Sequence, residues 1–235
     1  KVVSIPVRSE DLQYDVDAML DAVNEKPKLI RFINPNNPTG VYIEDKDLLR
    51  FCELGIPLCI DEAYFFYHPE VGSKAYLMKE YPHVFLQSTF SKAHGFCGIR
   101  FGYVLGTPEM IPAFNRMLLP WNVSLMSMAA AEAMLDNPEE LDYKVEHNNK
   151  WMKIFAEEIT KLGLKPYPAP GNYMLVDASV SGKTNAEILA AAKEMEKIYL
   201  KRISPINGKD GFFRVTPGLD EENERFLKFI RAYFG

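Results

Sequence analysis

Two cationic side chains, Lys92 and Arg100, lie eight residues apart within residues 88–103, and glycines separate them. Small hydroxyl residues, Thr89 and Ser91 among them, come directly before the lysine. A lysine that loses its proton in a partly buried, cationic setting is a nucleophile and can form a Schiff base with an aldehyde. Hydroxyl groups and an arginine suit a phosphate. An aldehyde that also carries a phosphate is pyridoxal 5′-phosphate (PLP), so this stretch predicts a PLP site; the competing interpretation is an ordinary surface lysine.

Two other segments carry groups that such a cofactor needs. Asp61 follows the apolar residues 57–60, and its carboxylate suits a protonated pyridine nitrogen, which keeps the ring able to accept electrons. Tyr64 and the Asn37 amide are candidates for hydrogen bonds to the ring oxygen. The alternatives are a helix cap or loop residue for Asp61, a packed aromatic for Tyr64, and a plain turn for the loop around Asn37.

The elements that must position these groups are short apolar strands alternating with helices. Strands are expected at residues 29–33, 57–60, 84–87 and 101–105, and helices at 15–24 (capped by Asp15) and 44–54. This alternation indicates a mostly parallel sheet covered on both faces. Ligands bind at the carboxyl ends of such strands, so Asn37, Asp61 and Lys92 are expected to lie near one another.

The later part of the chain has a different character. Residues 120–124 interrupt two helical patterns, and a long helix is expected at 138–162. Strands at 173–176, near Tyr199 and at 212–215, a helix at 185–197 and a final helix capped by Asp220 resemble a small α/β sandwich. That last helix has an apolar stripe of Phe226, Phe229, Ile230 and Tyr233.

Composition excludes several classes of protein. The 235 residues include 27 Lys and Arg against 32 Asp and Glu, a formal net charge of −5 without a basic stripe, which disfavours nucleic-acid binding. No apolar run is long enough to span a membrane. The three cysteines lack the pairing of a metal site, which suits a reduced, cytoplasmic setting. The chain starts at Lys1 with a strand-like run over residues 2–7, so we expect it to be the later part of a longer protein.

Three motifs occur together: N-P-N-N-P-T-G at residues 34–40, D-E-A-Y at 61–64, and S-K-A through G-I-R-F-G-Y at 91–103. In this order and spacing, the chain resembles the PLP-dependent aminotransferases of fold type I, classes I and II. It is most similar to the subgroup of histidinol-phosphate aminotransferases, through residues 120–123, 213–216 and 221–227. The resemblance implies an incomplete large PLP-binding domain (1–120), linking helices (121–160) and a small C-terminal α/β domain (161–235).

The resemblance also implies a role for each candidate residue. Lys92 becomes the Schiff-base lysine and the proton carrier between the substrate Cα and the cofactor C4′. The other cofactor contacts are Asp61 for the pyridine nitrogen, Asn37 and Tyr64 for the ring oxygen, and Thr89, Ser91 and Arg100 for the phosphate. Arg214 becomes the clamp on the substrate α-carboxylate, since a guanidinium fits a carboxylate with two parallel hydrogen bonds. Substrate contacts are also implied for Arg202, at the substrate phosphate, and for Asn172, lining the pocket; Lys201 beside Arg202 leaves a surface role equally open.

The implied reaction is transamination between histidinol phosphate and 2-oxoglutarate in histidine biosynthesis, by a homodimer. The alternatives are another class I or II aminotransferase, a PLP-dependent decarboxylase of a phosphorylated amino acid, or an inactive fragment, because the family's upstream portion, which cups the phosphate, is absent before Lys1. His94 and His68 are interpreted as solvated loop residues and Cys97 as small buried filler.

Overall fold

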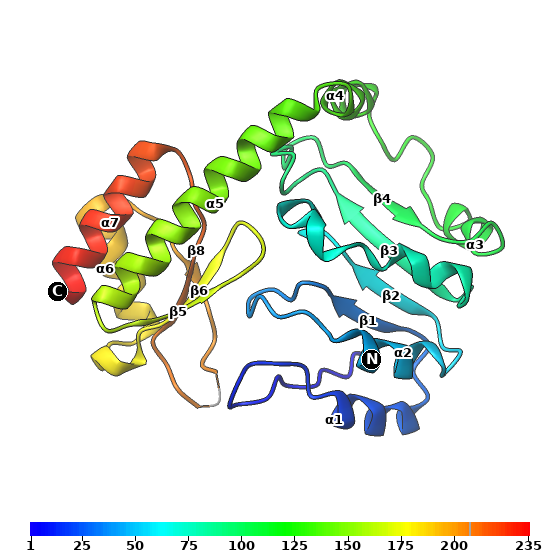
Figure 1. The fold of residues 1–235 in the computed structure, drawn as a ribbon, viewed down its shortest axis with the longest axis horizontal. Helices are drawn as coiled ribbons and strands as arrows, with labels where there is room; N and C mark the ends of the chain where they lie inside the picture. The colour runs from blue at the N-terminus through cyan, green and yellow to red at the C-terminus, as the bar shows by residue number, and fades with distance from the viewer. Residues whose placement is uncertain (207) are drawn as a thin grey trace. The chain divides into compact units, whose positions relative to one another are not determined.

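The computed structural model describes residues 1–206 and 208–235, which form two compact units (Figure 1). The first unit comprises Lys1–Asn36 and Val41–Lys144. The second comprises Asn37–Gly40 and Val145–Gly235. The loop that carries Asn37 therefore belongs with the later part of the chain.

The first unit is built on a four-stranded sheet. Its strands are β1 (Ile30–Ile33), β2 (Leu58–Asp61), β3 (Val84–Thr89) and β4 (Gly102–Leu105), in the spatial order β1-β2-β3-β4. The first three strands are parallel and β4 is antiparallel, which confirms the expected mostly parallel sheet. Ile33, Asp61 and Gln87 share one register position, so the carboxyl ends of the three parallel strands meet at one edge.

Short helices surround this sheet. They are α1 (Val16–Asp21), η1 (Ala22–Glu25), α2 (Asp45–Cys52), η2 (Phe65–Tyr67), η3 (Pro69–Val71), η4 (Lys74–Lys79), α3 (Ile111–Asn115) and α4 (Leu125–Leu135). The carboxylate of Asp15 caps α1 as expected, since it accepts a hydrogen bond from the Ala18 amide at 3.0 Å. Phe32, Ile60 and Leu86 share a buried cluster with α2 and with apolar residues of α1. From the opposite face, Phe85 packs against Phe114 of α3.

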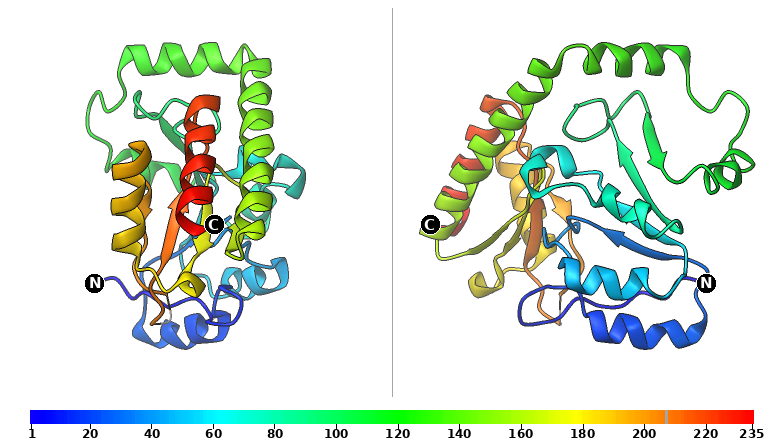
Figure 2. Two further views of the ribbon diagram at one scale, coloured as in Figure 1. Left: turned by 90° about the vertical axis from the view of Figure 1, so that its left-hand side faces the viewer. Right: turned by 45° about the vertical axis from the view of Figure 1, so that its right-hand side comes forward.

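The second unit has an antiparallel sheet in the order β5-β6-β8-β7. Its strands are β5 (Lys165–Pro168), β6 (Met174–Asp177), β7 (Lys201–Arg202) and β8 (Phe212–Val215). The later turns of α5 (Pro138–Lys161), with α6 (Asn185–Glu196) and α7 (Asp220–Phe234), cover one face of it; η5 (Ser179–Ser181) follows β6 (Figure 2). Side chains at alternate strand positions, such as Val176 and Phe213, join these helices in one core, which confirms the small α/β sandwich.

Two local expectations are wrong, and one strand was not anticipated. Residues 2–7 form no strand in the described chain, and Val2 is 87% exposed. Asp220 is the first residue of α7 rather than its cap; Leu219 precedes it, and the Asp220 carboxylate instead accepts a hydrogen bond from Trp151 Nε1 at 2.6 Å. Strand β5 was not expected. Among the described residues, no helix is both long and apolar enough to cross a membrane.

Candidate active site

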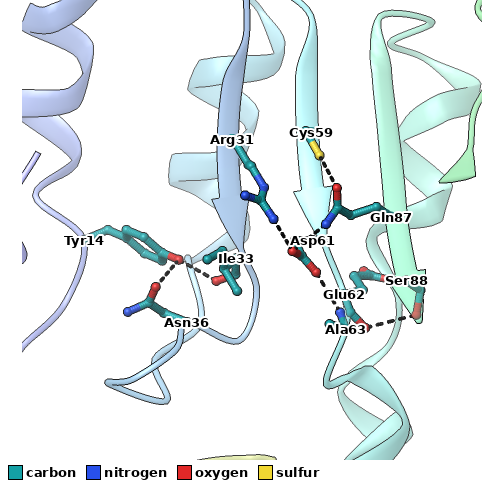
Figure 3. A network of polar contacts seen from close by, with 10 residues as sticks. All are labelled: Tyr14, Arg31, Ile33, Asn36, Cys59, Asp61, Glu62, Ala63, Gln87 and Ser88. Carbon is teal, nitrogen blue, oxygen red and sulfur yellow. Dashed lines mark hydrogen bonds and ion pairs between the residues drawn. The ribbon is translucent and has the colours of Figure 1, made fainter. Parts of the chain in front are cut away.

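Asp61 is the last residue of β2 and lies at the centre of a polar network (Figure 3). It is only 6% exposed. Its Oδ2 accepts hydrogen bonds from Arg31 Nη2 at 2.6 Å and Gln87 Nε2 at 2.7 Å, and its Oδ1 accepts one from the Ala63 amide at 3.0 Å. A carboxylate has about four acceptor positions, so one position on Oδ1 remains for a further donor.

The strand register explains how this network forms. Side chains at alternate positions of a strand share a face, so Arg31 on β1, Cys59 and Asp61 on β2, and Gln87 on β3 project from the same face of the sheet. Cys59 Sγ contacts Gln87 Oε1 at 3.8 Å, and burial raises the pKa of the Cys59 thiol to about 11. Sequence reasoning missed Arg31 and Gln87. Only the pairing of the strands reveals them.

Lys92 lies three residues beyond β3, in a tight turn that the Gly95 amide closes by donating to the Lys92 carbonyl at 2.8 Å. The lysine is half-buried, and its Nζ lies 5.5 Å from the centroid of the buried Tyr64 ring. An ammonium at this distance is attracted to the ring face. The structure therefore brings Lys92 and Tyr64 together beside the strand edge that carries Asp61.

The candidate phosphate contacts lie around the same turn. Thr89 Oγ1 donates to the Phe101 carbonyl at 3.1 Å and accepts from the Ser91 amide at 3.0 Å, so the Thr89 hydroxyl links the chain just before the lysine to the start of the β4 region after it. Arg100 is exposed, has a positive φ of 54°, and donates from Nη1 to the Cys97 carbonyl at 2.9 Å. A left-handed backbone is uncommon for a residue with a Cβ and is found where the surroundings enforce it.

Two further expectations on this stretch are wrong. His94 is 2% exposed, because its ring stacks on Phe90 at a centroid distance of 4.3 Å and meets Phe66 edge-on at 4.6 Å. Burial, and then the nearby Lys144 charge, lower the pKa of His94. Cys97 is exposed rather than buried.

In the second unit, Arg214 of β8 lies against Asn37. Its Nη1 donates to Asn37 Oδ1 at 2.8 Å, and its guanidinium carbon lies 5.5 Å from the centroid of the Tyr173 ring. The Nε of Arg214 is buried and has no hydrogen-bond partner among the residues that the structure describes. Such an orphaned donor is costly unless a ligand fills it.

Two candidate substrate contacts remain, Arg202 and Asn172. Arg202 is exposed and pairs with Phe213 in the register, so its side chain leaves the sheet on the face opposite to Arg214. Asn172 is half-buried and precedes Tyr173. The grouping is therefore Asp61, Tyr64, Thr89, Ser91, Lys92 and Arg100 in the first unit, and Asn37 with Arg214 in the second. Within the described residues, no three His, Cys, Asp or Glu side chains are grouped so as to hold a metal ion.

Comparison with known proteins identifies the family of the chain. The family model described as "Aminotransferase class I and II" matches residues 1–230. The chain belongs to the class I and II aminotransferase family. Its relatives include histidinol-phosphate aminotransferase 1 of Idiomarina loihiensis, 33% identical over 242 residues, and histidinol-phosphate aminotransferase 1 of Mannheimia succiniciproducens, 33% identical over 219 residues. They cover 100% and 91% of this chain.

The solved structures give the fold. The histidinol-phosphate aminotransferase of Sinorhizobium meliloti, solved in complex with pyridoxal 5′-phosphate, aligns with a TM-score of 0.85 at 25% identity, over 99% of this aminotransferase-family chain and 65% of its own. The fold is the type I fold of PLP-dependent transferases. The chain spans 64% and 58% of the length of these two curated relatives.

Proposed function

We propose that the whole protein is a PLP-dependent aminotransferase and that this chain supplies its cofactor lysine, Lys92. The observation that carries the proposal is the buried Asp61 carboxylate, which keeps one acceptor position and lies at the strand edge beside Lys92. A pyridine N–H needs such an acceptor. The polar groups of the first unit therefore suit PLP.

When bound, PLP withdraws electrons from the substrate Cα. Asp61 would accept the hydrogen bond of the pyridine N–H, and Asn37 and Tyr64 would contact the ring oxygen. The phosphate would be held by Thr89, Ser91 and Arg100, the last through a charge-assisted fork. Arg31 and Gln87 serve to hold the Asp61 carboxylate in position.

Lys92 would attach the cofactor through its Nζ and then move a proton between the substrate Cα and the cofactor C4′. General acid–base groups contribute about 10²–10⁴-fold to such steps. The tight turn closed at Gly95 limits the motion of the Lys92 backbone. The Lys92 amine is therefore held on one side of the bound cofactor and substrate.

Arg214 is the proposed clamp on the substrate α-carboxylate. Its buried Nε lacks a partner among the described residues, and a carboxylate oxygen would supply one. Arg202 and Asn172 stay predicted substrate contacts. The proposed amino donor is histidinol phosphate, with 2-oxoglutarate as acceptor; this choice is supported by the names of relatives at 33% identity.

We also propose that the whole protein is a homodimer. Several large apolar side chains around residues 117–126 are more than 70% exposed, namely Met117, Leu119, Trp121, Leu125 and Met126. An apolar surface of this kind marks an interaction site. Sedimentation of the whole protein measures the state directly, and a monomer at micromolar concentration would refute the proposal.

The cofactor assignment is tested by adding PLP, recording visible absorbance, reducing with borohydride and mapping the labelled peptide. We expect the label on Lys92. Lys92→Arg keeps the positive charge and should abolish the label, whereas Lys79→Arg, at an exposed position, should retain it. A label on any other lysine contradicts the site. The same test on a protein extended to the full length of its relatives shows whether the added segment completes the site.

Transamination is tested by glutamate production from histidinol phosphate and 2-oxoglutarate. Removal of Lys92 should lower the rate by about a thousandfold or more. Release of carbon dioxide from a phosphorylated amino acid, without glutamate production, would instead favour a decarboxylase.

A further inference from the structure

The His94 ring joins the two loops of the first unit that carry Lys92 and Tyr64. It stacks on Phe90, which comes shortly before Lys92, with an interplanar angle of 30°. It also meets Phe66, which comes shortly after Tyr64, edge-on at an angle of 74°. Aromatic pairs in these arrangements attract one another and have defined geometries. The imidazole therefore fixes the chain around Lys92 against the chain around Tyr64.

On the Lys92 side, the ring belongs to a short segment that backbone hydrogen bonds close. The Gly95 amide donates to the Lys92 carbonyl at 2.8 Å. Around this bond, the Phe96 amide donates to the Phe90 carbonyl at 2.9 Å. Lys92 and His94 thus lie in one compact turn, and a shift of the ring also shifts the backbone from which the lysine side chain extends.

On the Tyr64 side, Phe66 belongs to the single turn η2. The Tyr67 amide donates to the Tyr64 carbonyl at 3.1 Å, so Phe66 and Tyr64 are held in the same turn. The Tyr64 ring is buried, and Lys92 Nζ lies 5.5 Å from its centroid. The stacked His94 ring and this ammonium–ring contact therefore connect the same two loops at two points.

The His94 ring makes these connections by packing. It is only 2% exposed, and its buried Nδ1 has no hydrogen-bond partner among the described residues. Next to it, Lys144 Nζ donates to the His94 carbonyl at 3.2 Å and lies 5.4 Å from the centroid of the Phe96 ring. A phenyl ring can make the same stacked and edge-on contacts as the imidazole, whereas a small aliphatic side chain cannot.

We propose that His94 is a positioning residue whose ring keeps Lys92 Nζ beside Tyr64, in one place for reaction with the aldehyde of the cofactor. The inference rests on the proposed function, in which Lys92 is the cofactor lysine. A nucleophile reacts efficiently only when it is held close to its target in a restricted orientation, and a misplacement of about 1 Å can cost about a hundredfold in rate. His94 fulfils this role without exchanging a proton and without touching the cofactor.

The test treats the chain with two aldehydes, PLP at limiting concentration and formaldehyde, and then reduces it and maps the modified lysines. PLP reports on a positioned amine, whereas formaldehyde reports on how accessible each amine is. The exposed Lys79 is the internal reference, and Lys74, which is buried and paired with Asp45 at 2.6 Å, reports on unfolding. In the unaltered chain, PLP should label Lys92 faster than Lys79, and formaldehyde should label Lys79 faster than Lys92.

His94→Ala removes both ring contacts and releases the turn. Relative to Lys79, PLP labelling of Lys92 should fall by about tenfold or more. Formaldehyde labelling of Lys92 should rise by about threefold or more, because local opening exposes the amine, while Lys74 stays protected. His94→Phe keeps both ring contacts and should leave the two ratios within about twofold of their original values.

Phe66→Leu removes the edge-on contact from the opposite loop and should reproduce the pattern of His94→Ala. Its matched control is Phe51→Leu, which removes another edge-on contact in the same unit, to Phe32 at 4.9 Å. This control should change neither labelling ratio by more than about twofold. If His94→Ala also exposes Lys74, the variant has unfolded, and Phe66→Leu decides the question.

Three outcomes would overturn the inference: labelling ratios in Phe66→Leu that match those of Phe51→Leu, a His94→Phe chain that behaves like a folded His94→Ala chain, or an unaltered chain in which formaldehyde labels Lys92 as fast as Lys79. The proposed function fails separately. If PLP shows no preference for Lys92 in the unaltered chain, but the protection of Lys92 from formaldehyde depends on the His94 ring, the cofactor site is refuted and the positioning of the lysine stands.

Discussion

The two units differ in how fully the protein itself satisfies the hydrogen-bonding capacity of their candidate ligand groups. In the first, the buried Asp61 carboxylate already accepts three hydrogen bonds from Arg31, Gln87 and Ala63. In the second, the Arg214 guanidinium donates to Asn37, but its buried Nε has no partner among the described residues. The protein itself holds the Asp61 carboxylate in position, whereas the Arg214 guanidinium keeps one N–H that only a further acceptor would pair.

This difference suits the two proposed ligands. A cofactor that stays bound through many turnovers benefits from a partner fixed beforehand, because no ordering is needed when it binds. A substrate that enters and leaves benefits from an arginine whose unfilled donor, costing about 1–3 kcal/mol while it is buried and unpaired, is satisfied only in the complex. Variants of residues in the two units test this difference through the free energy of unfolding.

The largest effect is expected at Gln87. In Gln87→Leu, the buried Asp61 carboxylate loses one of its three donors, and the free energy of unfolding should fall by about 1–3 kcal/mol. Denaturant titration measures it. Gln13→Leu, at another partly buried glutamine for which no side-chain hydrogen bond is seen in the described chain, is the matched control and should change stability by less than about 0.5 kcal/mol. Equal effects of the two variants would show that Asp61 does not depend on its donors.

A smaller effect is expected at Arg214. Arg214→Met removes the bond to Asn37, which destabilises, and also removes the unpaired Nε, which stabilises. The two contributions are of similar size, so the free energy of unfolding should change by less than about 1 kcal/mol. Substrate affinity should nonetheless fall by tenfold or more, because the substrate carboxylate loses the two parallel hydrogen bonds of the Arg214 guanidinium. A stability loss above about 2 kcal/mol would mean that Arg214 is mainly a structural residue.

The comparison also shows why some site residues follow from the sequence. Asp61 and Lys92 lie at or beyond strand ends, where polar residues after an apolar run are conspicuous, and the sheet topology brings them to one edge. Arg31 and Gln87 lie within strands. Their meeting with Asp61 depends on which strands are neighbours and in what register, and neither can be deduced from one strand's own residues.

The same limit applies to the second unit. Strand β5 contains Pro166 and Pro168, and proline argues against a strand except at a sheet edge, which is where β5 lies. Lys201 and Arg202 are adjacent cations with equal claims as ligands until the pairing with β8 separates their faces. His94, in a loop rich in glycine, was expected to be solvated, but the aromatic rings of Phe90 and Phe66 enclose it.

His94 is the first unit's counterpart of Arg214, because its buried Nδ1 also lacks a partner among the described residues. The two orphaned nitrogens differ in one respect. A guanidinium keeps its charge at any ordinary pH, whereas an imidazole can stay neutral. Burial, and then the Lys144 charge, lower the pKa of His94 in the folded protein, so the fold retains the neutral ring.

The smallest effect is therefore expected at His94, and only in acid. The unfolded chain binds a proton at His94 near pH 6.5 and the folded protein binds it at lower pH, so stability present above pH 6.5 is lost as the pH falls towards the lowered pKa. His94→Phe, which keeps the aromatic stacking, and His94→Gln, which keeps polarity without titrating, should both flatten this slope, although only His94→Gln should lose stability at pH 8. Denaturant titrations from pH 8 to pH 5 measure the slope. If both variants retain the full dependence of the unfolding free energy on pH, the neutral buried ring of His94 does not set the acid sensitivity of the first unit.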